Sequence, residues 1–133
     1  MKEIKVILGE NQEVDAHFKG HVIKTDQTVK AGGEDKHPSP FDLFLASIGT
    51  CVGYYVKSFC NQRGIDQTGI EIIQEMHVDE VTRMIDTIEI NIRLPASFPE
   101  KYKESVVKAA GACTVKKHIA NAPEFTVKTV NTN

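Results

Sequence analysis

Three cysteines carry the most reactive side chains in this chain of 133 residues: Cys51, Cys60 and Cys113. A cysteine thiolate can attack a peroxide oxygen and become a sulfenic acid, which a second thiol then converts to a disulfide. An external dithiol returns such a pair to the reduced state. Three sparse cysteines argue against a structural disulfide framework. Two of them could therefore form a redox pair, provided their Cα atoms come within about 7 Å.

Cys51 lies near the middle of the longest predicted helix, residues 39–63, SPFDLFLASIGTCVGYYVKSFCNQR. A free cysteine in such a place is commonly a small apolar core residue. The middle of a helix gives no help from the helix dipole, and apolar burial raises a thiol pKa. A reactive Cys51 therefore needs a cation or a hydrogen-bond donor from another element. Cys60 comes nine residues later, at about 100° per residue on the other side of the helix, and we assign it to packing.

Cys113 begins a second, shorter predicted helix, residues 112–121, directly after Gly111 and Ala112. Unpaired N–H groups at a helix start favour a thiolate, and Lys116 and Lys117 add positive charge nearby. The alternative is a buried cysteine at a helix kink. The local sequence leaves both interpretations open.

The central helix carries clear start and stop signals. Ser39 can cap it, Pro40 suits the first helical position, and Asp42 completes a capping box. Gly64 follows Arg63 at the expected end. Apolar residues surround the helix almost completely, which is typical of a buried helix. At 1.5 Å per residue it would span roughly 37 Å, the width of a small domain.

The rest of the chain groups its strands apart from its helices, which indicates an α+β fold in a single domain, residues 1–133. Alternating apolar residues predict strands on both sides of the central helix, and residues 26–38 form a polar loop before it. The expected strands are 3–9, 12–19, 21–25, 69–79, 84–94 and 124–130, and the expected later helices are 98–110 and 112–121.

Composition excludes several kinds of partner. The net charge is −2 and no basic cluster stands out, so nucleic acid is a poor candidate. The N-terminus has no uninterrupted apolar run, and we expect no signal peptide and a reducing cytoplasm. The central helix contains Ser47, Thr50 and Lys57, among other polar residues, which favours a core helix over a membrane span.

The histidines indicate no metal site. Their spacings to one another and to the cysteines are not those of metal ligands, and the sequence gives no support to a zinc site made from Cys113, His118 and a third ligand. Gly32–Gly33 also lacks the residues of a phosphate-binding loop. We expect neither a metal nor a cofactor.

The order of elements, together with GEDKHPSPFDLFLASIGTC and the later CTVKKHI, resembles the OsmC/Ohr family of thiol-dependent hydroperoxide reductases. The resemblance implies antiparallel sheets packed around a long central helix in an intertwined homodimer, with the active site at the subunit interface. It also implies that Cys51 is the peroxidatic cysteine and Cys113 the resolving one, that the substrates are organic hydroperoxides, and that an external dithiol is the reductant.

The sequence departs from the family at one catalytic position. In typical members an acidic residue directly follows the proline at the helix start and pairs with an arginine that reaches the cysteine. Here Phe41 follows Pro40, and the acid comes one residue later as Asp42, which also has a capping role. No arginine precedes the helix. The missing positive charge could come from another basic residue of the N-terminal part: Lys24, Lys30, Lys36 or His37.

Two functions remain open at this stage. The first is a cytoplasmic thiol peroxidase in which Cys51, Cys113 and Asp42 are catalytic and an apolar pocket receives the hydroperoxide. The expected pocket residues lie near the helix: His37, Phe41, Phe44, Tyr54 and Tyr55. The second is a redox-sensing or small-ligand-binding protein of the same fold without efficient peroxidase activity, which the missing arginine favours.

Overall fold

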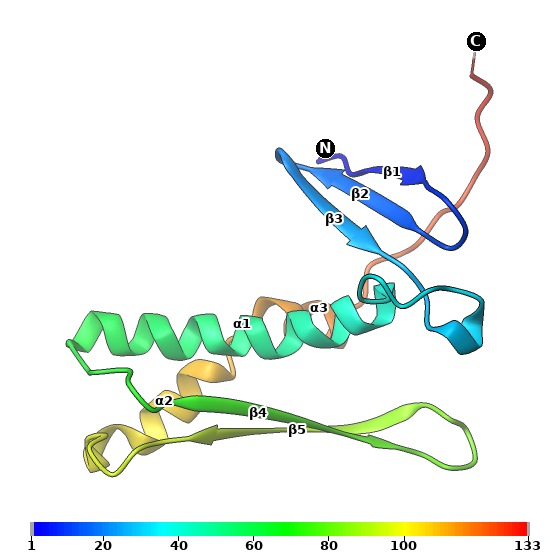
Figure 1. Ribbon diagram of the computed structural model, residues 1–133. Helices are drawn as coiled ribbons and strands as arrows, with labels where there is room; N and C mark the ends of the chain where they lie inside the picture. Colours follow the sequence, from blue (N-terminus) through cyan, green and yellow to red (C-terminus); the bar gives the residue numbers. More distant parts are fainter. Residues whose placement is uncertain (1, 133) are drawn as a thin grey trace. The chain divides into compact units, whose positions relative to one another are not determined.

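The computed structural model describes residues 2–132 and contains two compact units, residues 1–47 and residues 48–133 (Figure 1). The boundary between the units falls inside the long helix α1 (Pro40–Arg63). The elements are α and β with antiparallel pairing throughout, as the sequence predicts.

The N-terminal unit is built on a three-stranded antiparallel meander of β1 (Lys5–Leu8), β2 (Val14–Phe18) and β3 (His21–Thr25). The predicted strands are confirmed, and the register pairs Val6 with Ala16 and Ala16 with Ile23. The expected burial of one face is wrong for a single copy. Val6 is 58% exposed and Leu8 is 81% exposed.

A buried carboxylate organises the loop between β3 and α1. Asp26 is 1% exposed and accepts backbone N–H bonds from Gln27 at 2.7 Å, Glu34 at 3.3 Å and Lys36 at 3.1 Å. The hydrogen bond from Gln27, then the one from Lys36, lowers the pKa of Asp26. The sequence predicted the loop but not the role of Asp26 as its acceptor. No local sequence pattern shows that the loop will fold back and bring these three N–H groups to one carboxylate.

Helix α1 begins and ends where its sequence predicts. The Ser39 hydroxyl accepts the Asp42 N–H at 3.1 Å, and the Asp42 carboxylate accepts the Ser39 N–H at 3.1 Å. The two residues therefore form a reciprocal capping box. At the other end Gly64 adopts φ 62°, a left-handed conformation that ends helices and that glycine adopts without strain.

The C-terminal unit packs one face of α1 on a hairpin and two short helices. The hairpin joins β4 (Glu71–Val78) to β5 (Ile85–Arg93), and the later elements are η2 (Glu100–Tyr102), α2 (Lys103–Ala110) and α3 (Thr114–Ala120). The buried core joins α1 to the segments after the hairpin, and its members are Val52, Val56, Phe59, Cys60, Phe98, Val106, Ala110 and Cys113.

Burial of α1 is one-sided in this copy. The fully buried positions, Ile48, Val52, Val56, Phe59 and Cys60, recur about every four residues and so share one face. Tyr54 on another face is 63% exposed, so the predicted burial on all sides is wrong for a single chain. By length and composition alone α1 could cross a membrane, but its buried face packs as a core helix does.

The last predicted strand is not formed. Residues 122–132 follow α3 without regular structure, and Figure 1 shows them as an extended tail. Phe125 is 85% exposed and Val127 is 96% exposed. Residues 124–130 have the composition of a strand, but a strand needs a hydrogen-bonded neighbour, and this segment pairs with none of the strands in residues 2–132.

Candidate active site

Cys51 and Cys113 meet in the core of the C-terminal unit. Cys51 packs against the buried cluster that contains Cys113, and each thiol shifts the pKa of the other, although they are far apart in the sequence. Cys51 is half-buried and Cys113 is fully buried, and both thiols are free. The structure therefore brings the two thiols into one core, and their role as a redox pair stays a prediction.

The short connection between α2 and α3 places Cys113. Helix α2 buries Val106 and Ala110, and the Gly111 N–H bonds to the carbonyl oxygens of Val107 and Lys108, each at 3.2 Å. This tight turn makes Cys113 the N-cap of α3, where its sulfur accepts the Lys116 N–H at 3.4 Å. The predicted helix start at Cys113 is thus confirmed.

The start of α3 also acts on Cys51. The backbone N–H groups of Val115 and Thr114 and the thiol of Cys113 lie near enough to Cys51 to act on its pKa. Burial raises the pKa of Cys51, but the donors outweigh it, led by Val115, and the pKa of Cys51 lies below its ordinary value. The donor that Cys51 needs from another element is therefore the first turn of α3.

The pKa of Cys113 is shifted in the opposite direction, above its ordinary value. Burial raises its pKa, and its hydrogen bond to Cys51 and the charge of a Cys51 thiolate raise it further. The N–H groups of Lys116 and Val115 do lower the pKa of Cys113, as expected, but burial outweighs them and the pKa lies above its ordinary value. The two opposite shifts make Cys51 the more acidic thiol of the pair, while Cys113 holds its proton more strongly.

Tyr55 connects α1 to the start of α3. It lies one turn after Cys51, and its hydroxyl is 2.9 Å from the Thr114 hydroxyl. This contact fixes the residue whose N–H group bonds Cys51. Tyr55 was predicted as a pocket wall. No local pattern indicates the hydrogen bond, because its partner is 59 residues away.

Small residues of α1 allow the helix to approach β4. A Cβ atom on Gly49 would lie 2.7 Å from the Gln74 side-chain oxygen, and one on Gly53 would lie 3.4 Å from the Ile72 methyl group. These glycines flank Cys51 in the motif GTCVG, so the motif has a packing function on the hairpin side of the helix.

Cys60, the third thiol, is fully buried in the same core. Burial raises its pKa above the ordinary value, while Arg63 and Lys57 oppose that shift in smaller measure. A buried, protonated thiol is chemically inert. The structure agrees with the assignment of Cys60 to packing.

The remaining predicted site residues lie in the N-terminal unit. Asp42 forms the capping box, and the Phe41 and Phe44 rings stack with centroids 5.7 Å apart. The His37 ring lies 3.7 Å from the Glu13 carboxylate. Their catalytic or pocket roles stay predictions.

The arginine nearest to Cys51 in the sequence is engaged elsewhere. The Arg63 guanidinium lies 3.7 Å from the Phe59 ring centroid and donates to the Phe59 carbonyl oxygen at 3.2 Å. Within residues 2–132, no group of three or more His, Cys, Asp or Glu residues could hold a metal ion.

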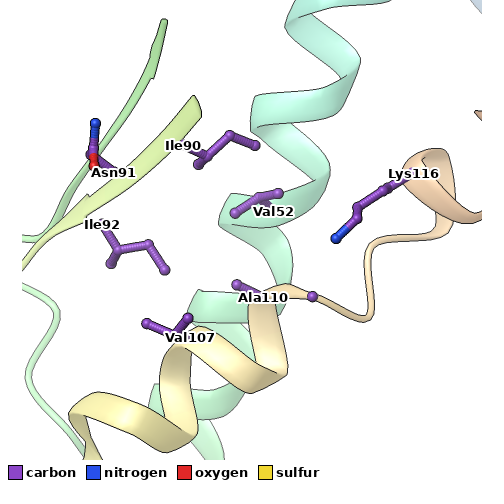
Figure 2. A pocket seen from close by; sticks show the side chains of 8 residues that line it. Val52, Ile90, Asn91, Ile92, Val107, Ala110 and Lys116 are labelled. Carbon is purple, nitrogen blue, oxygen red and sulfur yellow. The ribbon is translucent and has the colours of Figure 1, made fainter. Parts of the chain in front are cut away.

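A pocket of about 410 Å³ opens beside Val52, the neighbour of Cys51 (Figure 2). It lies among α1, β5, α2 and the start of α3. Its wall residues differ from the aromatic set that the sequence suggested: Val52, Ile90, Asn91, Ile92, Val107, Ala110, Gly111 and Lys116.

Comparison with known protein families assigns the chain to one of them. The sequence profile of the OsmC-like protein family matches residues 33–128, which include both cysteines of the pair. The chain belongs to the OsmC family. The resemblance that the sequence suggested is therefore confirmed, while curated proteins provide no match to this OsmC-family protein.

Solved structures show the same fold. A putative osmotic stress induced and detoxification response protein from Psychrobacter arcticus is 24% identical, with a TM-score of 0.70 over 88% of this chain and 87% of that one. A hypothetical protein from Aquifex aeolicus is 23% identical, with a TM-score of 0.70 over 92% and 89%. An organic hydroperoxide resistance protein OsmC from Legionella pneumophila is 17% identical, with a TM-score of 0.56 over 90% and 88%.

The Tyr55–Thr114 contact leads to a prediction for the Tyr55→Phe variant of this OsmC-family protein. Loss of the hydroxyl loosens the start of α3, weakens the N–H bonds to Cys51 and raises its pKa. A hydrogen bond contributes about 0.5–1.5 kcal/mol, so iodoacetamide should alkylate Cys51 up to about tenfold more slowly at pH 7. Peptide mass spectrometry over a pH series gives the rate at each cysteine.

The neighbouring tyrosine provides the control. Tyr54 is 63% exposed, and Tyr54→Phe should leave the alkylation profile of Cys51 unchanged. A Tyr55→Phe profile that coincides with the wild-type one would show that Tyr55 does not position the donors of Cys51.

Proposed function

We propose that this protein is a thiol peroxidase that reduces organic hydroperoxides in oxidative stress defence. The observation that carries the proposal is the Cys51 thiol, which packs against the core cluster that contains Cys113 and whose pKa is lowered by the N–H groups at the start of α3. These contacts favour the thiolate form of Cys51 and place a second thiol in the same core. They are the minimum requirements for a cysteine peroxidase that resolves through a disulfide.

The reaction follows from these two thiols. The Cys51 thiolate attacks the outer oxygen of the hydroperoxide, the O–O bond breaks, and the alkoxide takes up a proton and leaves as an alcohol. Cys51 is now a sulfenic acid. The Cys113 sulfur attacks it, a Cys51–Cys113 disulfide forms, and the hydroxyl leaves as water with the Cys113 proton. An external dithiol, oxidised in turn, reduces the disulfide.

Family membership supports the chemistry at a coarser level. The OsmC family includes proteins named for organic hydroperoxide resistance, such as the Legionella pneumophila structure. Membership therefore supports a redox or stress role. The step from that role to peroxidase activity depends on the geometry of Cys51, Cys113 and α3.

We further propose that the working unit is a cytoplasmic homodimer. One copy leaves large apolar side chains exposed on β1, on α1 and along residues 124–130, including Leu8, Phe44, Tyr54, Phe125 and Val127. A second copy would remove these surfaces from water, which is the main driving force of association. It would also give residues 124–130 a strand partner.

A second function keeps some support. A redox sensor or ligand-binding protein needs a thiol pair but no rapid turnover. The absence of an arginine before α1 favours it, because backbone N–H groups alone would then have to activate both the thiol and the peroxide. The two functions differ in whether the thiols react with stoichiometric hydroperoxide.

Thiol counting tests the peroxidase directly. The reduced protein is mixed with one equivalent of cumene hydroperoxide, and free thiols and intact mass are measured. We expect the loss of two thiols, a mass lower by two hydrogens, and one equivalent of cumyl alcohol. Cys51→Ser should abolish the reaction, while Cys60→Ser, the matched control, should leave it intact. Unchanged thiols under excess hydroperoxide would exclude the peroxidase.

A further inference from the structure

The pocket beside Val52 combines apolar walls with a single charge. Val52, Ile90 and Ile92 line one part of it, and Val107 and Ala110 line another. At about 410 Å³, it falls within the range of about 300–1,000 Å³ that is typical of small-molecule sites.

Of the two polar side chains in the lining, only Lys116 is available to a ligand. Asn91 alternates with Ile90 and Ile92 along β5, so its side chain points to the opposite face of the hairpin. There its amide donates to Glu75 at 3.4 Å and to Glu89 at 3.1 Å. Those two carboxylates therefore lie on the far face of the hairpin from the pocket.

Lys116 reaches into the pocket from α3. Figure 2 shows its side chain extended from the helix, with the ammonium nitrogen directed towards Val52 and Ala110. Within residues 2–132, no carboxylate lies within salt-bridge distance of this nitrogen. An ammonium group held beside apolar walls gains most from an anionic partner that brings its own apolar body.

We propose that this pocket binds an organic carboxylate, with its apolar body against Val52, Ile90 and Ile92 and its carboxylate paired with Lys116. The apolar part gains from burial, and the carboxylate gains a charge-assisted hydrogen bond. Val52 follows Cys51 in α1, but Cys51 itself does not line the pocket. The binding itself does not depend on the proposed peroxidase activity.

Calorimetry with a matched pair of ligands tests the proposal. The full-length reduced protein is titrated with 4-phenylbutyrate and with the neutral 4-phenylbutanol, neither of which is a peroxide. We expect the carboxylate to bind about tenfold more tightly than the alcohol, since a charge-assisted hydrogen bond contributes more than a neutral one. Methyl resonances of Val52, Ile90 and Ile92 should shift during a parallel NMR titration.

Three lysine variants locate the charge. Lys116→Met, which keeps the length of the side chain, should lose the preference for the carboxylate and bind 4-phenylbutanol as before. Lys116→Arg should keep the preference, and Lys117→Met should match the wild type. Equal affinity of the wild type for the two ligands, or an unchanged preference in Lys116→Met, would overturn the proposal. Since neither ligand reacts with thiols, failure here leaves the peroxidase proposal untouched.

Discussion

Replacement of Cys113 by serine is expected to stop peroxidase turnover after one reaction and to direct Cys51 to irreversible oxidation. Cys51 keeps the N–H donors of Val115 and Thr114, so it should still attack the first hydroperoxide. The resulting sulfenic acid then has no thiol beside it. A second hydroperoxide oxidises it to sulfinic acid, which dithiols do not reduce.

The substitution suits the site structurally. Cys113 is the N-cap of α3 and accepts the Lys116 N–H at 3.4 Å, and serine is among the preferred N-cap residues. The start of α3, with its N–H groups directed at Cys51, should therefore remain in place. A loss of turnover would then report the missing thiol and not a displaced helix.

Mass spectrometry and steady-state turnover measure the outcome. After excess cumene hydroperoxide, the Cys51 peptide of the variant should carry two or three added oxygen atoms, and dimedone should trap the sulfenic acid if added first. The wild type should show the disulfide, and Cys60→Ser should behave like the wild type. Continued turnover of Cys113→Ser with a dithiol would show that Cys113 is not the resolving cysteine.

The parts of the site that the sequence predicts are those fixed by local chemistry. The capping box of Ser39 and Asp42 and the glycine stop at Gly64 follow from side chains a few residues apart, and both were confirmed. The proximity of Cys51 and Cys113 came from a family resemblance, because residues 62 positions apart (113 − 51) share no local pattern.

The electrostatics of the site could not be predicted from either helix alone. The sequence placed N–H groups at the start of α3 and assigned their effect to Cys113, the nearest thiol. In the folded chain the N–H groups of Thr114 and Val115 also act on Cys51, and burial outweighs the N–H groups that act on Cys113, so the two pKa directions are reversed relative to that assignment. Packing between α1 and α3 decides which thiol the N–H groups at the start of α3 face.

Whether an apolar side chain is buried depends on the whole assembly, and not only on the local sequence pattern. The apolar residues of α1 and of residues 124–130 predict a buried helix and a strand, yet Tyr54 is 63% exposed and Val127 is 96% exposed in one copy. Hydrophobic periodicity identifies surfaces that avoid water, but it does not say which chain covers them.

The Gly33→Ala variant is expected to destabilise the loop that leads into α1. A Cβ atom at residue 33 would lie 2.1 Å from the Gln27 carbonyl oxygen, 2.5 Å from its carbonyl carbon and 2.8 Å from an Asp26 carboxylate oxygen. Two of these neighbours are backbone atoms and cannot rotate away, so the chain around Gln27 must move. The Asp35 N–H donates to that same Gln27 oxygen at 3.0 Å, and this bond would be lost.

The movement also reaches Asp26, whose buried carboxylate accepts three backbone N–H bonds. Overpacking costs about 1–3 kcal/mol, and a lost hydrogen bond adds about 1 kcal/mol. We therefore expect the free energy of unfolding to fall by about 2–4 kcal/mol, measured by urea denaturation. Gly20→Ala is the control, since Gly20 has φ 80° but no neighbour within 4 Å of the new Cβ, and its strain should cost only about 1 kcal/mol. Equal losses in the two variants would show that the contacts of Gly33 do not limit the loop.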